Sequence, residues 1–217
     1  MRLTADQHDG LSAGWERNPL LRRALLGTAL IYFAWNCLYY TPYVVDDAFI
    51  SLRYARNLVA GQGLVYNPGQ RVEGFSNFLW TLLEAGLLAC GLPVLAGIKT
   101  LGLASGLALV AMTYRLGRLL FEARPAVALL ATVMLCLNTS LAVWTQAGLE
   151  TAFFAALIVA MCLRFELEQR EPSARPLSAL VFGLLWLTRP EAPAYGLYFV
   201  ARRFLGRDRR PLERRDL

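Results

Sequence analysis

The sequence predicts an all-α fold: a polytopic membrane bundle of about six transmembrane helices, with two further helices at the membrane surface. Two observations lead to this prediction. Of the 217 residues, 56% are hydrophobic, and the mean hydropathy is +0.41, whereas soluble domains of this length are typically less apolar. The apolar residues also come in blocks, several of them long enough to cross a hydrocarbon core about 30 Å thick.

Six apolar segments are the candidate spans. They comprise residues 24–40, 95–114, 125–143, 151–168, 177–188 and 191–205. The last two are short, and we expect them to form a hairpin around Arg189, Pro190 and Glu191. A polar tail, residues 1–23, precedes the first span and begins without a cleavable signal pattern, so that span is expected to be an uncleaved anchor. A basic tail, residues 206–217, follows the last span.

A further apolar segment, residues 75–90, is ambiguous because as a helix it reaches only about 24 Å. The positive charges decide its placement. If the N-terminus is cytoplasmic and the segment does not cross, most of the 22 Lys and Arg residues lie on the cytoplasmic side. If the segment crosses, most of them lie outside, against the positive-inside rule. We therefore expect a transmembrane domain over residues 24–205, with residues 75–90 at the membrane surface and both termini cytoplasmic.

This arrangement puts a long loop, residues 41–94, on the outer face of the membrane. Within it, residues 47–60 carry an apolar stripe that includes Ala48 and Leu52 opposite a polar face, the pattern of an amphipathic helix lying flat on a membrane. Together with residues 75–90, the loop therefore holds two interfacial helices. A loop of this length is too long for a simple connector.

Two adjacent acids, Asp46 and Asp47, stand where the first interfacial helix begins. Acids are favourable at a helix N-terminus, so a purely structural role is open. The alternative is a catalytic carboxylate that deprotonates an acceptor hydroxyl at the membrane boundary. In that case we expect one acid to react and the other to cap or orient. Adjacent acids also admit a divalent cation, which is the cofactor that this pair suggests.

Other charged residues on the outer side are candidates for substrate binding. Arg53 and Arg56 lie three residues apart on the polar face of the first interfacial helix. They are either solvated arginines or phosphate ligands, since guanidinium groups bind phosphate oxygens well. Glu150 either is the first-turn acid of the fourth span or completes a site with Asp46. Arg189 and Glu191 either pair with each other or line the same cavity.

Several function classes lose support. The sequence contains no P-loop, GxGxxG or HExxH pattern, so nucleotide and zinc-hydrolase chemistry is not indicated. The four cysteines lie in apolar stretches without metal-ligand spacing, and we expect them to be packed thiols. The net charge of +6 in a membrane protein indicates contact with anionic membrane lipid and not with nucleic acid.

The outer loop resembles a known family. Asp46–Trp80 reads DDAFISLRYARNLVAGQGLVYNPGQRVEGFSNFLW and resembles the first extracytoplasmic loop of the GT-C superfamily of membrane glycosyltransferases. Within that superfamily it is most similar to the bacterial arabinofuranosyltransferase-like family. Two later segments, Ala147–Ala155 (AGLETAFFA) and Leu187–Ala192 (LTRPEA), look like later motifs of that family in the same order.

The resemblance implies an integral enzyme of the bacterial inner membrane, or the N-terminal half of one. It would transfer a sugar, with arabinofuranose as the candidate, from a polyprenyl-phosphate donor. The acceptor would be a cell-envelope glycan or lipid on the extracytoplasmic face. Family members are typically longer, so a second polypeptide supplying missing helices is an expected partner. The alternative is a noncatalytic or truncated membrane protein that acts as a scaffold or binds lipid-linked sugars.

The resemblance also assigns roles to residues. By position, Asp46 matches the general base of an inverting transfer, with Asp47 beside it. Glu150 matches the acid of the second outer loop. Arg189 and Glu191 match family positions to which the resemblance gives no role.

Overall fold

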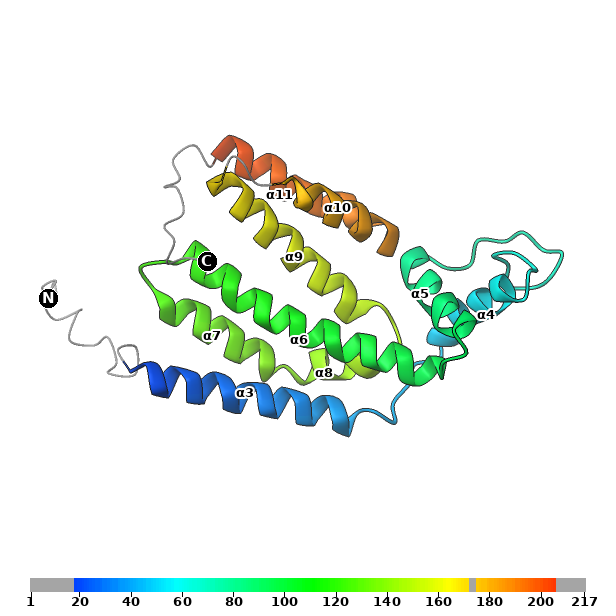
Figure 1. Ribbon diagram of the computed structural model, residues 1–217, viewed down its shortest axis with the longest axis horizontal. Coiled ribbons are helices and arrows are strands. Elements are labelled where there is room, and N and C mark those ends of the chain that lie inside the picture. Colours follow the sequence, from blue (N-terminus) through cyan, green and yellow to red (C-terminus); the bar gives the residue numbers. More distant parts are fainter. Residues whose placement is uncertain (1–17, 172–174, 206–217) are drawn as a thin grey trace, which may run out of the picture.

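The structure is a computed structural model that describes residues 18–171 and 175–205. All regular secondary structure in these two ranges is helical (Figure 1). The helices, in chain order, are α3 (Pro19–Tyr39), α4 (Ala48–Val59), α5 (Phe78–Ala89), α6 (Val94–Leu120), α7 (Pro125–Cys136), α8 (Thr139–Gln146), α9 (Thr151–Arg170), α10 (Leu177–Thr188) and α11 (Ala192–Leu205).

The predicted all-α class is confirmed, and each predicted helical segment contains a helix. The candidate span over residues 125–143 is not one straight helix, because α7 and α8 meet at an angle of 56°. The break falls at Asn138, whose side-chain oxygen accepts the N–H of Leu141 at 3.3 Å and so caps α8. Asparagine is a favoured N-cap, which explains why a new helix starts there.

The number of membrane spans is supported only in part. Among the described residues, α6 is the one helix that is both long and apolar enough to cross a membrane by itself. The bent pair of α7 and α8 meets the same requirement when counted as a single span. α5 and α10 are apolar but shorter. One or two spans thus follow from helix length and composition, and the six-span arrangement stays a prediction.

The long helices form a bundle in which α6 runs between α7 and α9 (Figure 1). Close packing at its centre depends on small residues. A Cβ atom at Gly102 of α6 would lie 2.1 Å from the carbonyl oxygen of Thr145 on α8, so no side chain fits between these helices. Phe33 of α3 and Val110 of α6 are nearly inaccessible to solvent in the same core cluster. A core packed this tightly holds the helix ends in a fixed relation.

The predicted packing of the cysteines is correct for part of the set. Cys37 and Cys136 are buried in the core, and Cys162 is half-buried. Cys90 is exposed at the end of α5, where the chain turns through Gly91 toward α6. The prediction of a packed thiol is therefore wrong for Cys90, because the apolar run ends in a turn and not inside a helix.

α4 and α5 pack against each other at one end of the bundle (Figure 1). Leu52 of α4 and Trp80 of α5 are buried against Ile98 near the start of α6. The indole N–H of Trp80 also donates to the carbonyl of Gly148 at 3.1 Å, which ties α5 to the turn before α9. This end of the bundle therefore brings together the acidic pair's helix and the turn that carries Glu150.

α4 also organises the loop between the two helices. The side-chain amide of Asn57 donates to the carbonyls of Val65 and Tyr66 at 2.8 and 2.9 Å. The hydroxyl of Tyr54 donates to the carbonyl of Val72 at 2.8 Å. These bonds pair side chains of α4 with backbone carbonyls of the loop. The loop is thus tied to α4, and its last residues are carried to the start of α5.

Candidate functional site

An open pocket of about 830 Å³ lies where the start of α4, the segment before α5, and the turns before α9 and α11 converge. Segments far apart in sequence form its walls, so the pocket exists only in the folded chain. The lining residues are Asp47, Ile50, Ser51, Glu73, Gly74, Phe75, Ser76, Asn77, Phe78, Leu149, Glu150, Arg189 and Pro190.

Glu150 is the centre of a polar network in this pocket. Its carboxylate is 3% exposed and accepts two short hydrogen bonds. Nε of Arg189 donates to one oxygen at 2.7 Å, and the side-chain amide of Asn77 donates to the other at 2.7 Å. A buried carboxylate is tolerated only when it is paired in this way. The network therefore fixes three segments of the chain around one charge.

Arg189 connects this buried acid to the pocket opening. Its Nη1 donates to the exposed carboxylate of Glu191 at 3.2 Å, and its guanidinium carbon lies 5.6 Å from the ring centre of Phe154. Burial alone would lower the pKa of Arg189, but the hydrogen bonds and negative charges of Glu150 and Glu191 raise it above its usual value. Arg189 therefore stays positively charged, and a guanidinium has further N–H donors for a ligand.

The local backbone explains why these side chains converge. Gly148 has φ of +89°, a conformation that favours glycine, and a Cβ there would lie 3.1 Å from the Cβ of Ala48. This glycine turn allows the chain to leave α8 and start α9 directly after Glu150. Arg189 follows α10 in an extended conformation, with φ of −153° and ψ of 142°, before Pro190.

Lys99 joins the acidic pair's linker to the loop that carries Glu150. Its ammonium group donates to the carbonyls of Thr41 and Tyr43 at 2.6 Å each, and to that of Gln146 at 2.8 Å. An ammonium has three donors, so all of them are used. The N–H of Val45 adds a bond to the Ala147 carbonyl at 3.1 Å. Sequence reasoning missed this role of Lys99.

The structure places the two adjacent acids differently. Both acids are exposed, but Asp47 lines the pocket and Asp46 is not part of its wall. A carboxylate oxygen of Asp46 accepts the backbone N–H of Asp47 at 3.1 Å. Asp47 holds the N-cap position of α4 without a side-chain capping bond, so its carboxylate is not committed to the helix.

The two arginines of α4 lie outside this pocket. Nε of Arg53 donates to the carbonyl of Tyr66 at 3.1 Å, and its guanidinium lies over the Tyr66 ring. Arg56 is exposed. The structure thus brings together Asp47, Glu150 and Arg189, with Glu191 at the edge, and leaves Arg53 and Arg56 as separate predicted phosphate ligands.

Glu84 of α5 lies directly behind the pocket wall and is inaccessible to solvent. One of its oxygens accepts the hydroxyl of Ser51 at 3.3 Å, and the other has no hydrogen-bond partner. Burial raises the pKa of Glu84 most, the Ser51 hydrogen bond lowers it, and the charge of Glu150 raises it, which together bring it to about 8. Glu84 is therefore protonated and uncharged at neutral pH.

No group of three or more His, Cys, Asp or Glu residues that could hold a metal ion occurs in the part of the chain that the structure describes. The two acids that suggested a divalent cation, Asp46 and Asp47, therefore have no third ligand of these types beside them.

Comparison with known proteins identifies two relatives, both named terminal beta-(1->2)-arabinofuranosyltransferase. The chain is 32% identical to the one from Mycobacterium tuberculosis over 181 residues, which cover 76% of this chain and 28% of the relative. It is 50% identical to the one from Corynebacterium glutamicum over 38 residues, or 18% of this chain and 6% of the relative. No family model and no solved structure matches the chain.

These relatives confirm the resemblance to arabinofuranosyltransferases that the motifs predicted. The chain spans less than a third of the length of the mycobacterial relative. The pocket holds a buried acid, a charged arginine and an accessible carboxylate. An arginine is a group that binds anions, and an accessible carboxylate is a group that accepts protons.

Proposed function

This chain is a relative of the arabinofuranosyltransferases, and from that relationship we propose that it is an integral membrane glycosyltransferase, or the N-terminal half of one. The proposed donor is a sugar linked to polyprenyl phosphate, with arabinofuranose as the sugar that the relatives' name suggests. The proposed acceptor is a cell-envelope glycan or lipid. The reaction would take place on the extracytoplasmic face of a bacterial inner membrane.

The pocket beside Glu150 is the observation that carries this proposal. A glycosyl transfer from a lipid phosphate needs a base for the acceptor hydroxyl and a positive group for the departing phosphate. Asp47 and Arg189 line the same pocket and supply one group of each kind. Because Arg189 is held by Glu150 at 2.7 Å, its charge is already oriented before a substrate binds, which is what electrostatic stabilisation requires.

The proposed mechanism is a single displacement that inverts the anomeric carbon. The acidic pair takes the proton of the acceptor hydroxyl, and the hydroxyl oxygen forms a bond to the anomeric carbon. The bond from that carbon to the phosphate oxygen breaks, and its electrons leave with polyprenyl phosphate. Arg189 stabilises the negative charge that develops on the phosphate.

The identity of the base within the pair is the point at which two arguments differ. The family resemblance assigns the base to Asp46, and the pocket geometry favours Asp47 because Asp47 lines the wall. We propose that the pair as a unit supplies the base, with the second carboxylate orienting the first. Asp46 already accepts the Asp47 N–H at 3.1 Å, so the two positions are linked.

A noncatalytic role is the second candidate. In that case the chain would bind a lipid-linked sugar or act as a scaffold, and another polypeptide would complete an enzyme. Arg53 and Arg56 keep their proposed role as phosphate ligands in either case, acting on a donor headgroup near α4.

The test is a transfer assay in membranes that contain the full chain. Radiolabelled arabinofuranosyl polyprenyl phosphate is supplied as donor and an arabinan oligosaccharide as acceptor. Transfer above that of membranes without the chain supports the enzyme. Donor binding without transfer supports the noncatalytic candidate. Neither binding nor transfer would contradict both.

A further inference from the structure

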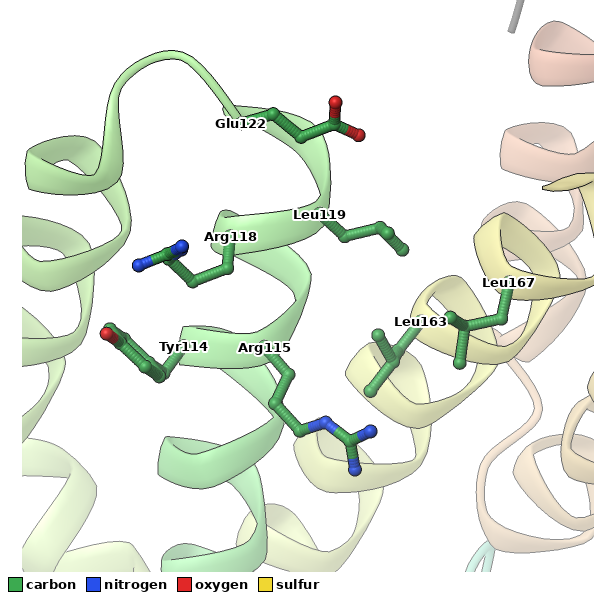
Figure 2. A pocket seen from close by; sticks show the side chains of 7 residues that line it. All are labelled: Tyr114, Arg115, Arg118, Leu119, Glu122, Leu163 and Leu167. Atoms are coloured by element: carbon green, nitrogen blue, oxygen red, sulfur yellow. The ribbon is translucent and has the colours of Figure 1, made fainter. Parts of the chain in front are cut away.

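A second pocket lies at the opposite end of α6, between α6 and α9. Its volume is about 310 Å³. Figure 2 shows Tyr114 and Arg118 on one side of α6 and Arg115 and Leu119 on the side that faces α9. The lining residues are Tyr114, Arg115, Arg118, Leu119, Glu122, Leu163 and Leu167. None of them belongs to the candidate site described above.

The hydropathy of α6 gives the depth of this pocket. α6 is apolar enough to cross a membrane, and a hydrocarbon core needs about 20 helical residues. Counting from Leu95, such a stretch ends near Tyr114, one residue before Arg115. Tyrosine beside arginine is typical of the boundary between hydrocarbon and headgroups. The pocket therefore lies at headgroup level, whichever way α6 crosses.

The charges in this pocket leave two cations uncommitted. Glu122 forms an ion pair with Nη1 of Arg170, whose Nη2 also donates to the Leu119 carbonyl at 2.6 Å. The carboxylate of Glu122 is thus neutralised by a residue that is already fixed. Arg115 and Arg118 are exposed and form no ion pair with any residue in the described ranges. The pocket therefore presents a net positive charge to a ligand.

The remaining wall is apolar. Leu163 and Leu167 lie one turn apart on α9 and face the pocket beside Arg115 (Figure 2). Arginines next to leucines at headgroup depth suit a molecule with an anionic head and a hydrocarbon chain. A free anion would contact the arginines alone, whereas an acyl chain would also contact the apolar wall.

We propose that this pocket binds an anionic phospholipid of the surrounding bilayer, with the phosphate held by Arg115, an acyl chain against Leu163 and Leu167, and Arg118 adding positive charge at the pocket edge. Basic pockets between helices are a recurrent way to hold such headgroups. From Lys99, near the candidate site, to Arg115 the rise along α6 is about 24 Å. The lipid is therefore a separate ligand, and its binding does not depend on glycosyl transfer.

The test uses the full chain in nanodiscs of equimolar phosphatidylglycerol and phosphatidylcholine. Native mass spectrometry counts the lipids that remain bound after release. We expect retention of phosphatidylglycerol over phosphatidylcholine. We expect Arg115→Gln with Arg118→Gln to reduce this preference about tenfold, because the headgroup then loses the charge-assisted hydrogen bonds that a pocket arginine donates to its phosphate.

The matched control removes the same charge from arginines of the same end that do not line the pocket: Arg23→Gln with Arg124→Gln, both exposed. The control should keep the preference within about twofold. An equal loss in both double variants would overturn the proposal, because general attraction would then explain the binding. Displacement of the lipid by millimolar inorganic phosphate would also overturn it, since the pocket would then be a site for free anions.

Discussion

The two ends of α6 differ in whether their charged side chains are buried and paired or exposed and unpaired. At the candidate site, Glu150 is buried, and both of its oxygens accept hydrogen bonds from protein side chains. At the other end, Arg115 and Arg118 are exposed without an ion-pair partner among the described residues. A buried charge without a partner is costly, whereas an exposed one is not. The site end therefore has a fixed geometry, and the other end is free to take a ligand.

This difference predicts how each end responds to substitution. Removing the charge of Glu150 leaves its hydrogen-bond donors without an acceptor in a place that water reaches poorly. Removing the charge of Arg115 or Arg118 deprives no described residue of an ion-pair partner. The expected effects are therefore larger at the site end than at the opposite end.

The largest effect is expected at the acidic pair. Substitution of the proposed base by Asn, at Asp46 or at Asp47, should reduce transfer about 10²–10⁴-fold, because an amide cannot take the acceptor proton. The two single variants, compared in the membrane transfer assay, identify which carboxylate is the base. Undiminished transfer in both would remove the acidic pair from the mechanism.

Glu84 is the one acid of the site end with a buried oxygen that lacks a hydrogen-bond partner among the described residues, so it tests whether that end avoids unpaired buried charge. Its pKa is raised to about 8 in the folded chain, mainly by burial, and an unfolded chain releases this proton at lower pH. Between the pKa of Glu84 in the unfolded chain and its pKa in the folded chain, folding therefore takes up a proton. The contribution of Glu84 is most favourable at low pH and is lost as the pH rises to about 8.

The expected loss is at most about 4 kcal/mol between pH 5 and pH 8. Glu84→Gln should remove this pH dependence because the amide does not titrate. Apparent melting temperatures of both proteins, measured over that range, give the comparison. Parallel curves for the wild type and the variant would show that Glu84 is already ionised in the folded chain.

Glu150→Ala should leave the side chains of Arg189 and Asn77 without the carboxylate to which both donate. We expect the free energy of unfolding to fall by about 2–3 kcal/mol, because a partly buried guanidinium loses its partner. The matched control is Glu191→Ala, which removes an exposed carboxylate from the same arginine and should cost about 0.5 kcal/mol or less. Thermal unfolding in detergent measures both, and equal losses would mean that burial does not distinguish the two acids.

Lys99→Met should release the linker before the acidic pair. Three carbonyl groups lose an ammonium donor, so we expect about 1–2 kcal/mol of destabilisation. Transfer should fall more than stability predicts, because the acids are then less well positioned. Thr100→Val is the control, since Thr100 is exposed and bonds only within α6. A transfer rate equal to that of the control would leave Lys99 with a purely structural role.

The smallest effect is expected at the opposite end. Arg115→Gln with Arg118→Gln should change the free energy of unfolding by about 0.5 kcal/mol or less in phosphatidylcholine. Neither arginine has an ion-pair partner in the described ranges, so no such interaction is lost. A loss as large as that of Glu150→Ala in the same unfolding measurement would abolish the contrast between the two ends.

The helices could be predicted because hydropathy and turn residues act locally. Residues 177–188 contain α10 with the predicted bounds, and Arg189 and Glu191 pair across the following turn as one of the two predicted alternatives. The bend between α7 and α8 was missed, although Asn138 is a readable N-cap signal. Hydropathy alone predicts one long span over this apolar run, and it does not detect a cap inside the run.

The assembly of the site could be predicted only in outline. The membrane topology predicted from the positive charges put Glu150 and the acidic pair on the same side, and Asp47 does line the pocket with Glu150. The contacts of Lys99 carry no sequence signal, because its three partners are backbone carbonyls. The bond between Asn77 and Glu150 joins residues far apart in the chain, and only the packing of α5 against its neighbours brings them together.

The most direct test of the account is a structure of the full chain with a nonhydrolysable phosphonate analogue of an arabinofuranosyl polyprenyl phosphate. The account predicts that the phosphonate oxygens lie within hydrogen-bond reach of Arg189 and that the anomeric carbon faces the acidic pair. An analogue bound instead at Arg115 and Arg118, or away from both ends, would contradict it.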